Sequence, residues 1–115
     1  MTELSVNLNK VATLRNTRPH DAPSVLQAGR TALTAGAAGL TVHPRPDARH
    51  IREQDVLDLA ELLRQPEWHG REYNIEGYPD DRFIDLIARV RPDQVTLVPD
   101  APEQSTSDHG WDLPR

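Results

Sequence analysis

The sequence contains no cysteine. A disulfide framework and a metal site built from thiolates are therefore both excluded. The sequence also lacks long hydrophobic runs, since no apolar stretch approaches the roughly 20 residues that cross a bilayer. Residues 1–7 have neither the basic segment nor the apolar core of a signal peptide. These absences predict a soluble, cytoplasmic protein that has no membrane partner.

Positive charge is also in deficit. Lysines and arginines number 13 against 18 acidic residues, which gives a formal charge of −5 at pH 7. Binding to nucleic acid needs a dominant basic surface, so we expect no nucleic-acid partner. An anionic ligand must then be held by individual arginines or backbone amides, and not by the overall field of the protein. The five histidines show no metal-ligand spacing such as His-x-x-x-His, and we expect no metal.

The chain alternates between strand and helix patterns. Leu4, Val6 and Leu8 alternate with polar residues, which predicts a first strand with Asn7 and Asn9 on its polar face. Further strands are predicted at 40–43, 73–76 and 94–98. Helices are predicted from Ser24 to about Ala35 with Gly36 just past its end, from about Glu53 to Arg64, and after a cap at Asp80 or Asp81, with Phe83, Ile84, Ile87 and Val90 as the buried side of this third helix.

This order predicts an α/β fold with parallel strands joined by right-handed crossovers. An open doubly wound sheet and half of a closed barrel both fit. Buried strands of an open sheet are apolar on both faces, whereas here polar residues recur along each strand and gather at its carboxyl end, at Asn9, His43, Glu76 and Thr96. The barrel is therefore favoured.

A complete (β/α)₈ barrel needs about 250 residues and eight strands, whereas this chain has 115 residues and four predicted strands. We therefore expect residues 1–115 to be the N-terminal half of a single barrel domain, with residues 99–115 as a polar substrate-covering loop or tail. A truncated product, a fragment and a half that dimerises to close a barrel all remain open. The unpaired edges of the first and fourth strands predict association or poor solubility.

Four short motifs lie at the predicted strand ends. They are Ser5-Val6-Asn7-Leu8-Asn9 with Thr13-Leu14-Arg15-Asn16, then Thr41-Val42-His43-Pro44-Arg45-Pro46-Asp47 with Arg49-His50-Ile51, then Asn74-Ile75-Glu76, and Leu97-Val98-Pro99 with Ser105-Thr106-Ser107. Taken in order, they resemble the N-terminal half of the pyridoxine 5′-phosphate synthase family over essentially the whole chain. The resemblance implies a homo-oligomeric transferase that condenses 1-deoxy-D-xylulose 5-phosphate with 3-amino-2-oxopropyl phosphate, without metal or organic cofactor.

The resemblance also implies individual roles. His43 and Glu76 are the acid–base residues, since ring closure needs proton transfers that a histidine or a carboxylate of tuned pKa assists. Arginines suit the two phosphates because their guanidinium groups bind phosphate bidentately. The implied ligands are Asn7 and Arg18 for the aminooxopropyl phosphate, and Arg45, His50 and Thr106 for the deoxyxylulose phosphate.

The sequence departs from the family at Asn9-Lys10, where many members have Asp-His in contact with the sugar phosphate. Asn9 and Lys10 can still bond to a phosphorylated ligand, but with a different set of donors and acceptors. A later catalytic histidine and a glycine-rich phosphate site of the family lie beyond Arg115. Two alternatives therefore stay open: an inactive or merely phosphate-binding fragment, or a barrel enzyme that acts on another phosphorylated sugar.

Overall fold

The computed structural model describes residues 4–17, 24–45 and 50–99. Strands and helices alternate along most of this length, as the sequence predicted. In chain order the elements are β1 (Ser5–Asn7), α1 (Asn9–Asn16), α2 (Val25–Thr34), β2 (Gly39–Val42), α3 (Glu53–Leu63), a 3₁₀ turn at Pro66–Trp68, β3 (Glu72–Gly77), α4 (Asp81–Val90) and β4 (Gln94–Leu97).

All four strands are parallel and lie in the order β1-β2-β3-β4, so that each strand pairs with the one before it in sequence. A doubly wound sheet reverses its strand order at a switch point, whereas a barrel adds strands consecutively. The consecutive order therefore confirms the prediction of half a barrel. The polar and apolar sides of β3 also agree with the prediction, since Tyr73 and Ile75 are buried and Asn74 and Glu76 are partly exposed.

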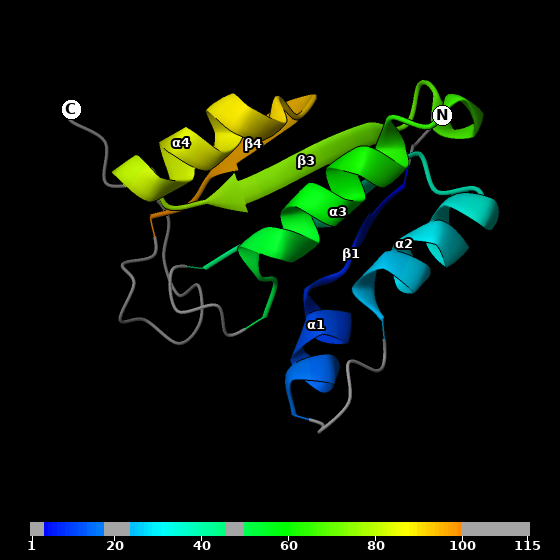
Figure 1. Cartoon of the computed structure of the whole chain (residues 1–115), viewed down its shortest axis with the longest axis horizontal. Coiled ribbons are helices and arrows are strands. Elements are labelled where there is room, and N and C mark those ends of the chain that lie inside the picture. Colours follow the sequence, from blue (N-terminus) through cyan, green and yellow to red (C-terminus); the bar gives the residue numbers. More distant parts are fainter. Residues whose placement is uncertain (1–3, 18–23, 46–49, 100–115) are drawn as a thin grey trace.

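Three helices, α2, α3 and α4, cover one face of the sheet (Figure 1). The core lies between this helical layer and the apolar face of the strands. Burial of these side chains provides the main stabilisation of the fold, at about 25 cal/mol per Å² of apolar surface removed from water. Fully enclosed members include Leu33 of α2, Leu40 and Val42 of β2, Val56 and Leu59 of α3, and Ile75 of β3.

The helix boundaries follow the capping signals in the sequence. The side chain of Ser24 accepts a hydrogen bond from the amide of Gln27 and begins α2. Gly36 follows α2 with φ of 104°, a conformation that a side chain disfavours. The carboxylate of Asp80, rather than that of Asp81, accepts from the amide of Phe83 and begins α4.

The prediction for the first strand was wrong beyond Asn7, where the observed strand ends. Asn9 is the first residue of α1 and not the end of β1, which stops at Asn7. The sequence pattern did not predict this helix because its buried face consists of Ala12 and a charged residue, Arg15, in place of an apolar stripe. A buried arginine needs partners from elsewhere in the fold, which hydrophobic periodicity does not reveal.

The prediction that Ile84 is buried was also wrong. This residue was predicted on the buried side of α4, but it is 54% exposed. The buried stripe of α4 consists of Phe83, Leu86 and Val90, and Ile84 lies one step around the helix from Phe83. Within the described residues no further helix packs beside α4 on that side, so this apolar surface stays open.

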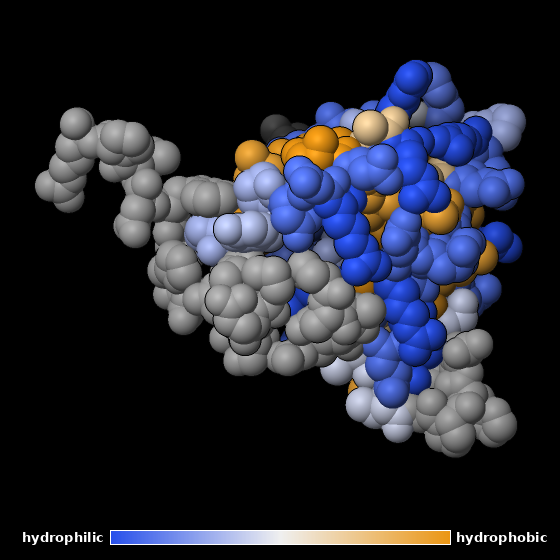
Figure 2. Space-filling view, turned by 60° about the vertical axis from the view of Figure 1, so that its left-hand side comes forward, coloured by the Kyte–Doolittle hydropathy of each residue, from blue (hydrophilic) through white to orange (hydrophobic). Residues whose placement is uncertain are grey.

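The two edges of the sheet are open as well. In the described part of the chain, β1 pairs only with β2, and β4 pairs only with β3. Val95 and Leu97 of β4 are large apolar side chains with 39% and 47% of their surface exposed. Figure 2 shows an apolar patch near the top of an otherwise mostly hydrophilic face. An outer face of β4 without a helical cover is what half of a barrel leaves behind.

Candidate active site at the carboxyl ends of the strands

Polar side chains occupy the face of the sheet opposite the helices. Ser5 Oγ and Thr41 Oγ1 share a hydrogen bond of 2.7 Å between β1 and β2. Thr96 Oγ1 donates to Asn74 Oδ1 at 3.0 Å between β4 and β3. These cross-strand bonds show that the polar side chains of neighbouring strands share one face, which becomes the interior surface in a closed barrel.

His43 and Glu76 come together at the end of this polar face. Val42, the last residue of β2, pairs with Ile75 of β3, so one further step along each strand leads to His43 and Glu76. Neighbouring strands lie about 4.7–4.9 Å apart, which makes these two residues neighbours across the strand ends. The prediction that they share one mouth therefore has support in the register of the sheet.

Glu76 is partly buried, and burial raises the pKa of its carboxyl group above the ordinary value for glutamate. The cause is desolvation, because a low-dielectric surrounding disfavours the charged form. A carboxyl group with a raised pKa exchanges protons more readily near neutral pH. This property suits the acid–base role that the sequence predicted for Glu76.

Asn7, Asn9 and His43 form a short chain of hydrogen bonds. The side-chain oxygen of Asn7 accepts from the amide of Asn9 at 2.8 Å, and the side-chain oxygen of Asn9 accepts from the amide of His43 at 2.9 Å. Asn9 therefore holds the backbone of His43 through its side-chain oxygen. Lys10, the other residue of the divergent pair, is exposed on α1.

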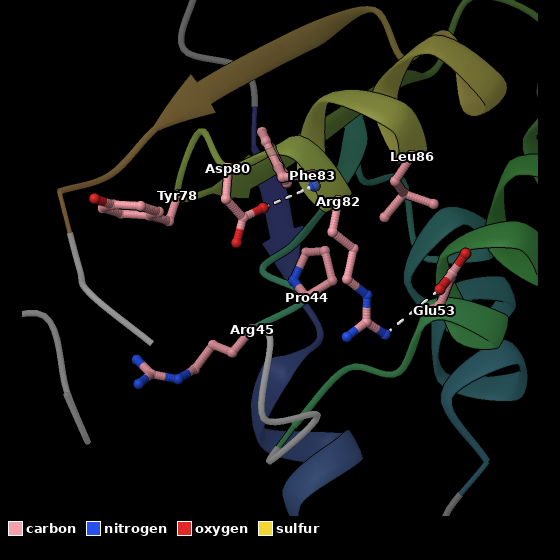
Figure 3. Close-up of a pocket in the computed structure, with 8 residues that line it drawn as sticks. All are labelled: Pro44, Arg45, Glu53, Tyr78, Asp80, Arg82, Phe83 and Leu86. Carbon is pink, nitrogen blue, oxygen red and sulfur yellow. Dashed lines mark hydrogen bonds and ion pairs between the residues drawn. The ribbon is translucent and has the colours of Figure 1, made fainter. Parts of the chain in front are cut away.

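Arg45 is 7% exposed and lines a small cavity where the loops after β2 and β3 meet. Figure 3 shows Arg45 and Tyr78 extending toward the same side of this cavity, while Arg82 turns toward Glu53. Neither Tyr78 nor Arg82 was predicted as a site residue from the sequence. Consecutive parallel strands bring their following loops together, and that topology is the signal that points to both residues.

This cavity encloses about 30 Å³, whereas pockets for small organic ligands usually measure about 300–1,000 Å³. A small organic ligand at this end therefore needs walls beyond those in the described residues. A larger hollow of about 550 Å³ lies at the amino end of β3 and β4, where Arg64, Arg71 and Arg91 alternate with Glu72 and Asp93. In barrel enzymes the amino ends of the strands serve stability and the carboxyl ends carry chemistry. We therefore assign the site to the carboxyl ends of the strands, where the smaller cavity lies.

The remaining predicted residues divide into two groups. His50 lies just before α3 and its backbone carbonyl accepts a hydrogen bond from the side chain of Asn16. Arg18, Thr106 and the segment 100–115 lie outside the described residues. Across residues 4–17, 24–45 and 50–99, no group of three or more histidine or acidic side chains is arranged to hold a metal ion. No helix in the same ranges has both the length and the apolar character to cross a membrane.

Four consecutive parallel strands with helices on one face and polar residues at their carboxyl ends define the N-terminal half of a (β/α)₈ barrel. Residues 4–115 match the family of the pyridoxal phosphate biosynthesis protein PdxJ, and the chain belongs to this family. A pyridoxine 5′-phosphate synthase from Brucella anthropi is 60% identical over 111 residues, which are 96% of this chain and 45% of that protein. Relatives of the same name from Brucella suis and Brucella abortus are 59% identical with the same coverage. The chain thus spans about half the length of these relatives.

Proposed function

We propose that this chain supplies the first half of a pyridoxine 5′-phosphate synthase. The complete enzyme joins 1-deoxy-D-xylulose 5-phosphate to 3-amino-2-oxopropyl phosphate and releases pyridoxine 5′-phosphate, inorganic phosphate and water. The observation that carries the proposal is the convergence of His43 and Glu76 at the carboxyl end of the sheet, together with the burial that raises the pKa of Glu76. The family and the names of the relatives support a role in vitamin B6 biosynthesis.

The reaction consists of proton transfers around carbon–nitrogen and carbon–carbon bond formation. The amine of one substrate attacks the ketone of the other, and water leaves as the imine forms. Further loss of water and of phosphate completes the aromatic ring. Glu76, with its raised pKa, takes a proton from carbon or nitrogen, and His43 beside it returns one to a departing oxygen. Both positions lie on strand ends, where a rigid sheet fixes their separation.

Substrate binding is assigned to the loops. Asn7 and Arg18 hold the aminooxopropyl phosphate, and Arg45, His50 and Thr106 hold the deoxyxylulose phosphate in this proposal. The enclosure of Arg45 in a low-dielectric environment strengthens its attraction for a phosphate dianion. The small volume beside Arg45 indicates that the second half of the barrel provides the opposite wall of the site.

A product assay tests the proposal directly. Both phosphorylated substrates are supplied to the 115-residue chain and to the same chain extended by its natural downstream sequence, and pyridoxine 5′-phosphate is quantified. We expect product from the extended chain alone. Product from the short chain would mean that two copies close a barrel. Absence of product in both would shift weight to another phosphorylated substrate, or to a fragment that only binds phosphate.

Glu76→Gln in the extended chain tests the assigned base. The amide keeps the size of the side chain but cannot take up a proton, so we expect kcat to fall by a factor of about 10² to 10⁴. The matched control is Glu61→Gln on the exposed surface of α3, which makes the same chemical change away from the site and should leave kcat unaltered. Normal turnover by the Glu76→Gln enzyme would eliminate this residue as the base.

A further inference from the structure

The segment between β2 and α3 is tied to α1 at both of its described ends. At the beginning, Asn9 accepts a hydrogen bond from the amide of His43. At the end, the side-chain nitrogen of Asn16 donates to the carbonyl oxygen of His50 at 2.9 Å. Helix α1 is thus attached to the backbone of two residues, His43 and His50, that carry predicted roles in the reaction.

Arg15 orients Asn16 for this contact. The guanidinium of Arg15 donates to the side-chain oxygen of Asn16 through Nε at 3.0 Å and through Nη2 at 2.8 Å. Because the amide oxygen is occupied by both donors, the amide nitrogen of Asn16 has to face the carbonyl of His50. The same Nη2 also lies 3.5 Å from that carbonyl oxygen.

Asp55 at the beginning of α3 completes the network. Its Oδ1 forms an ion pair with Arg15 Nη1 at 2.5 Å, and the two side chains are only 7% and 11% exposed. Its other oxygen accepts from the amide of Arg52 at 2.8 Å. The network therefore forms hydrogen bonds to the backbone on both sides of Ile51, at the carbonyl of His50 and at the amide of Arg52.

Stability alone gives a weak reason for such an arrangement. Taking two charges out of water costs about as much as their attraction returns, and a well-packed apolar pair is often as stable. What charged, bidentate bonds add is a defined geometry. Here the defined geometry is imposed on the main chain at residues 50–52, next to a predicted substrate ligand.

We propose that Arg15, Asn16 and Asp55 are positioning residues, which fix the backbone at residues 50–52 and so hold the imidazole of His50 toward the phosphorylated sugar. The proposal rests on the proposed function, because it takes His50 as a ligand of deoxyxylulose phosphate. None of the three residues needs to contact substrate. Their effect is confined to the substrate bound by the loop before α3 and does not extend to the aminooxopropyl phosphate.

Asn16→Asp in the extended chain separates the two bonds of Asn16. The carboxylate keeps an acceptor for Arg15, but it has no donor for the carbonyl of His50. We expect KM for deoxyxylulose 5-phosphate to rise about tenfold, while kcat and KM for the aminooxopropyl phosphate stay unchanged. Arg15→Lys retains the positive charge beside Asp55 and loses the planar fork, so it should shift the same KM in the same direction. Gln27→Glu, on the exposed surface of α2, is the matched amide-to-carboxylate control and should change neither KM.

Backbone hydrogen exchange gives a readout that does not depend on the reaction. In Asn16→Asp the amides of Ile51 and Arg52 should exchange faster than in the parent, whereas Gln27→Glu should leave them alone. Equal rises in both KM values, or unchanged exchange at residues 51 and 52, would overturn the positioning role. If the parent makes no pyridoxine phosphate, the proposed function fails, and exchange still decides whether the network fixes this backbone.

Discussion

At the scale of single residues, the site combines groups whose placement opposes the stability of the fold. Glu76 is a carboxyl group that burial desolvates, and Arg15 is a cation enclosed almost entirely by protein. The two residues differ in whether a partner compensates their charge. Arg15 has the carboxylate of Asp55 at 2.5 Å, whereas desolvation dominates at Glu76, and its charged form is therefore unfavourable.

The raised pKa of Glu76 predicts an effect on stability as a function of pH. The folded protein binds this proton more tightly than the unfolded chain, so the favourable contribution is complete below the unfolded pKa and is lost as pH rises through the folded pKa. Glu76→Gln removes the charged form, and it should therefore raise the free energy of unfolding at pH 7 while lowering kcat.

The measurement is urea unfolding of the parent and the Glu76→Gln variant at pH 7 and near pH 4, where the difference between them should shrink. Glu61→Gln on exposed α3 serves as control and should show no such pH-dependent gain. A Glu76→Gln protein that is less stable than the parent at pH 7 would show that the carboxylate is stabilised by a partner rather than disfavoured by burial.

At the scale of elements, local signals decided most boundaries, and the exceptions have physical causes. The caps of α2 and α4 lie at Ser24 and Asp80, as short polar residues before an apolar pattern predict. Helix α1 carries its main buried contact through an arginine, so its periodicity is hidden. Helix α4 ends at Arg91 in a left-handed conformation with φ of 54°, where glycine is the usual choice.

Arg91→Gly should stabilise the protein because it relieves the steric cost of a side chain in the left-handed conformation. That cost is roughly 1–2 kcal/mol, of which the greater flexibility of glycine in the unfolded chain offsets about 0.5–1. We expect a gain of up to about 1.5 kcal/mol in the free energy of unfolding, measured by urea titration. Ala88→Gly places glycine inside the same helix, at an exposed position with helical backbone. It should lower the free energy of unfolding by about 1 kcal/mol. A loss in both variants would mean that Arg91 contributes more through contacts than its backbone conformation costs.

At the scale of the whole molecule, the sheet is open at both edges and its last strand lacks a helical cover. Ile84 on α4 and Val95 on β4 are exposed in the described structure at 54% and 39%. In a complete barrel the next strand and helix would bury such residues. The exposed apolar surface is therefore the clearest physical mark that the fold continues beyond these four strands.

The 115-residue chain should consequently self-associate at micromolar concentration, as sedimentation velocity can measure, whereas the extended chain should not do so through this surface. Ile84→Gln combined with Val95→Thr removes apolar area while keeping residues suited to helix and strand, so it should reduce association. Leu14→Gln, at an exposed position of α1, is the control and should leave association unchanged. A parent chain that stays monomeric at high concentration would contradict this expectation.

Much of the fold was predictable because it depends on local chemistry. Alternation of strand and helix patterns, two caps and a glycine after α2 predicted seven of the observed elements and their parallel arrangement. The polar face of β3 followed from a period of two residues along the strand, whereas the pairing of His43 with Glu76 as candidate acid–base residues came from the resemblance to the family. The register of the sheet brings that pair together as the pattern required.

Other features were decided only by the tertiary structure. Asn9 turned out to hold the amide of His43 from within a helix, and Arg15 is matched to an aspartate 40 residues away. Sequence by itself determined the order of seven elements, the parallel sheet and the residue types at the strand ends, since these follow from local periodicity. Only the folded chain decided which polar groups meet, because hydrogen bonds and ion pairs depend on distances between segments that lie far apart in the sequence.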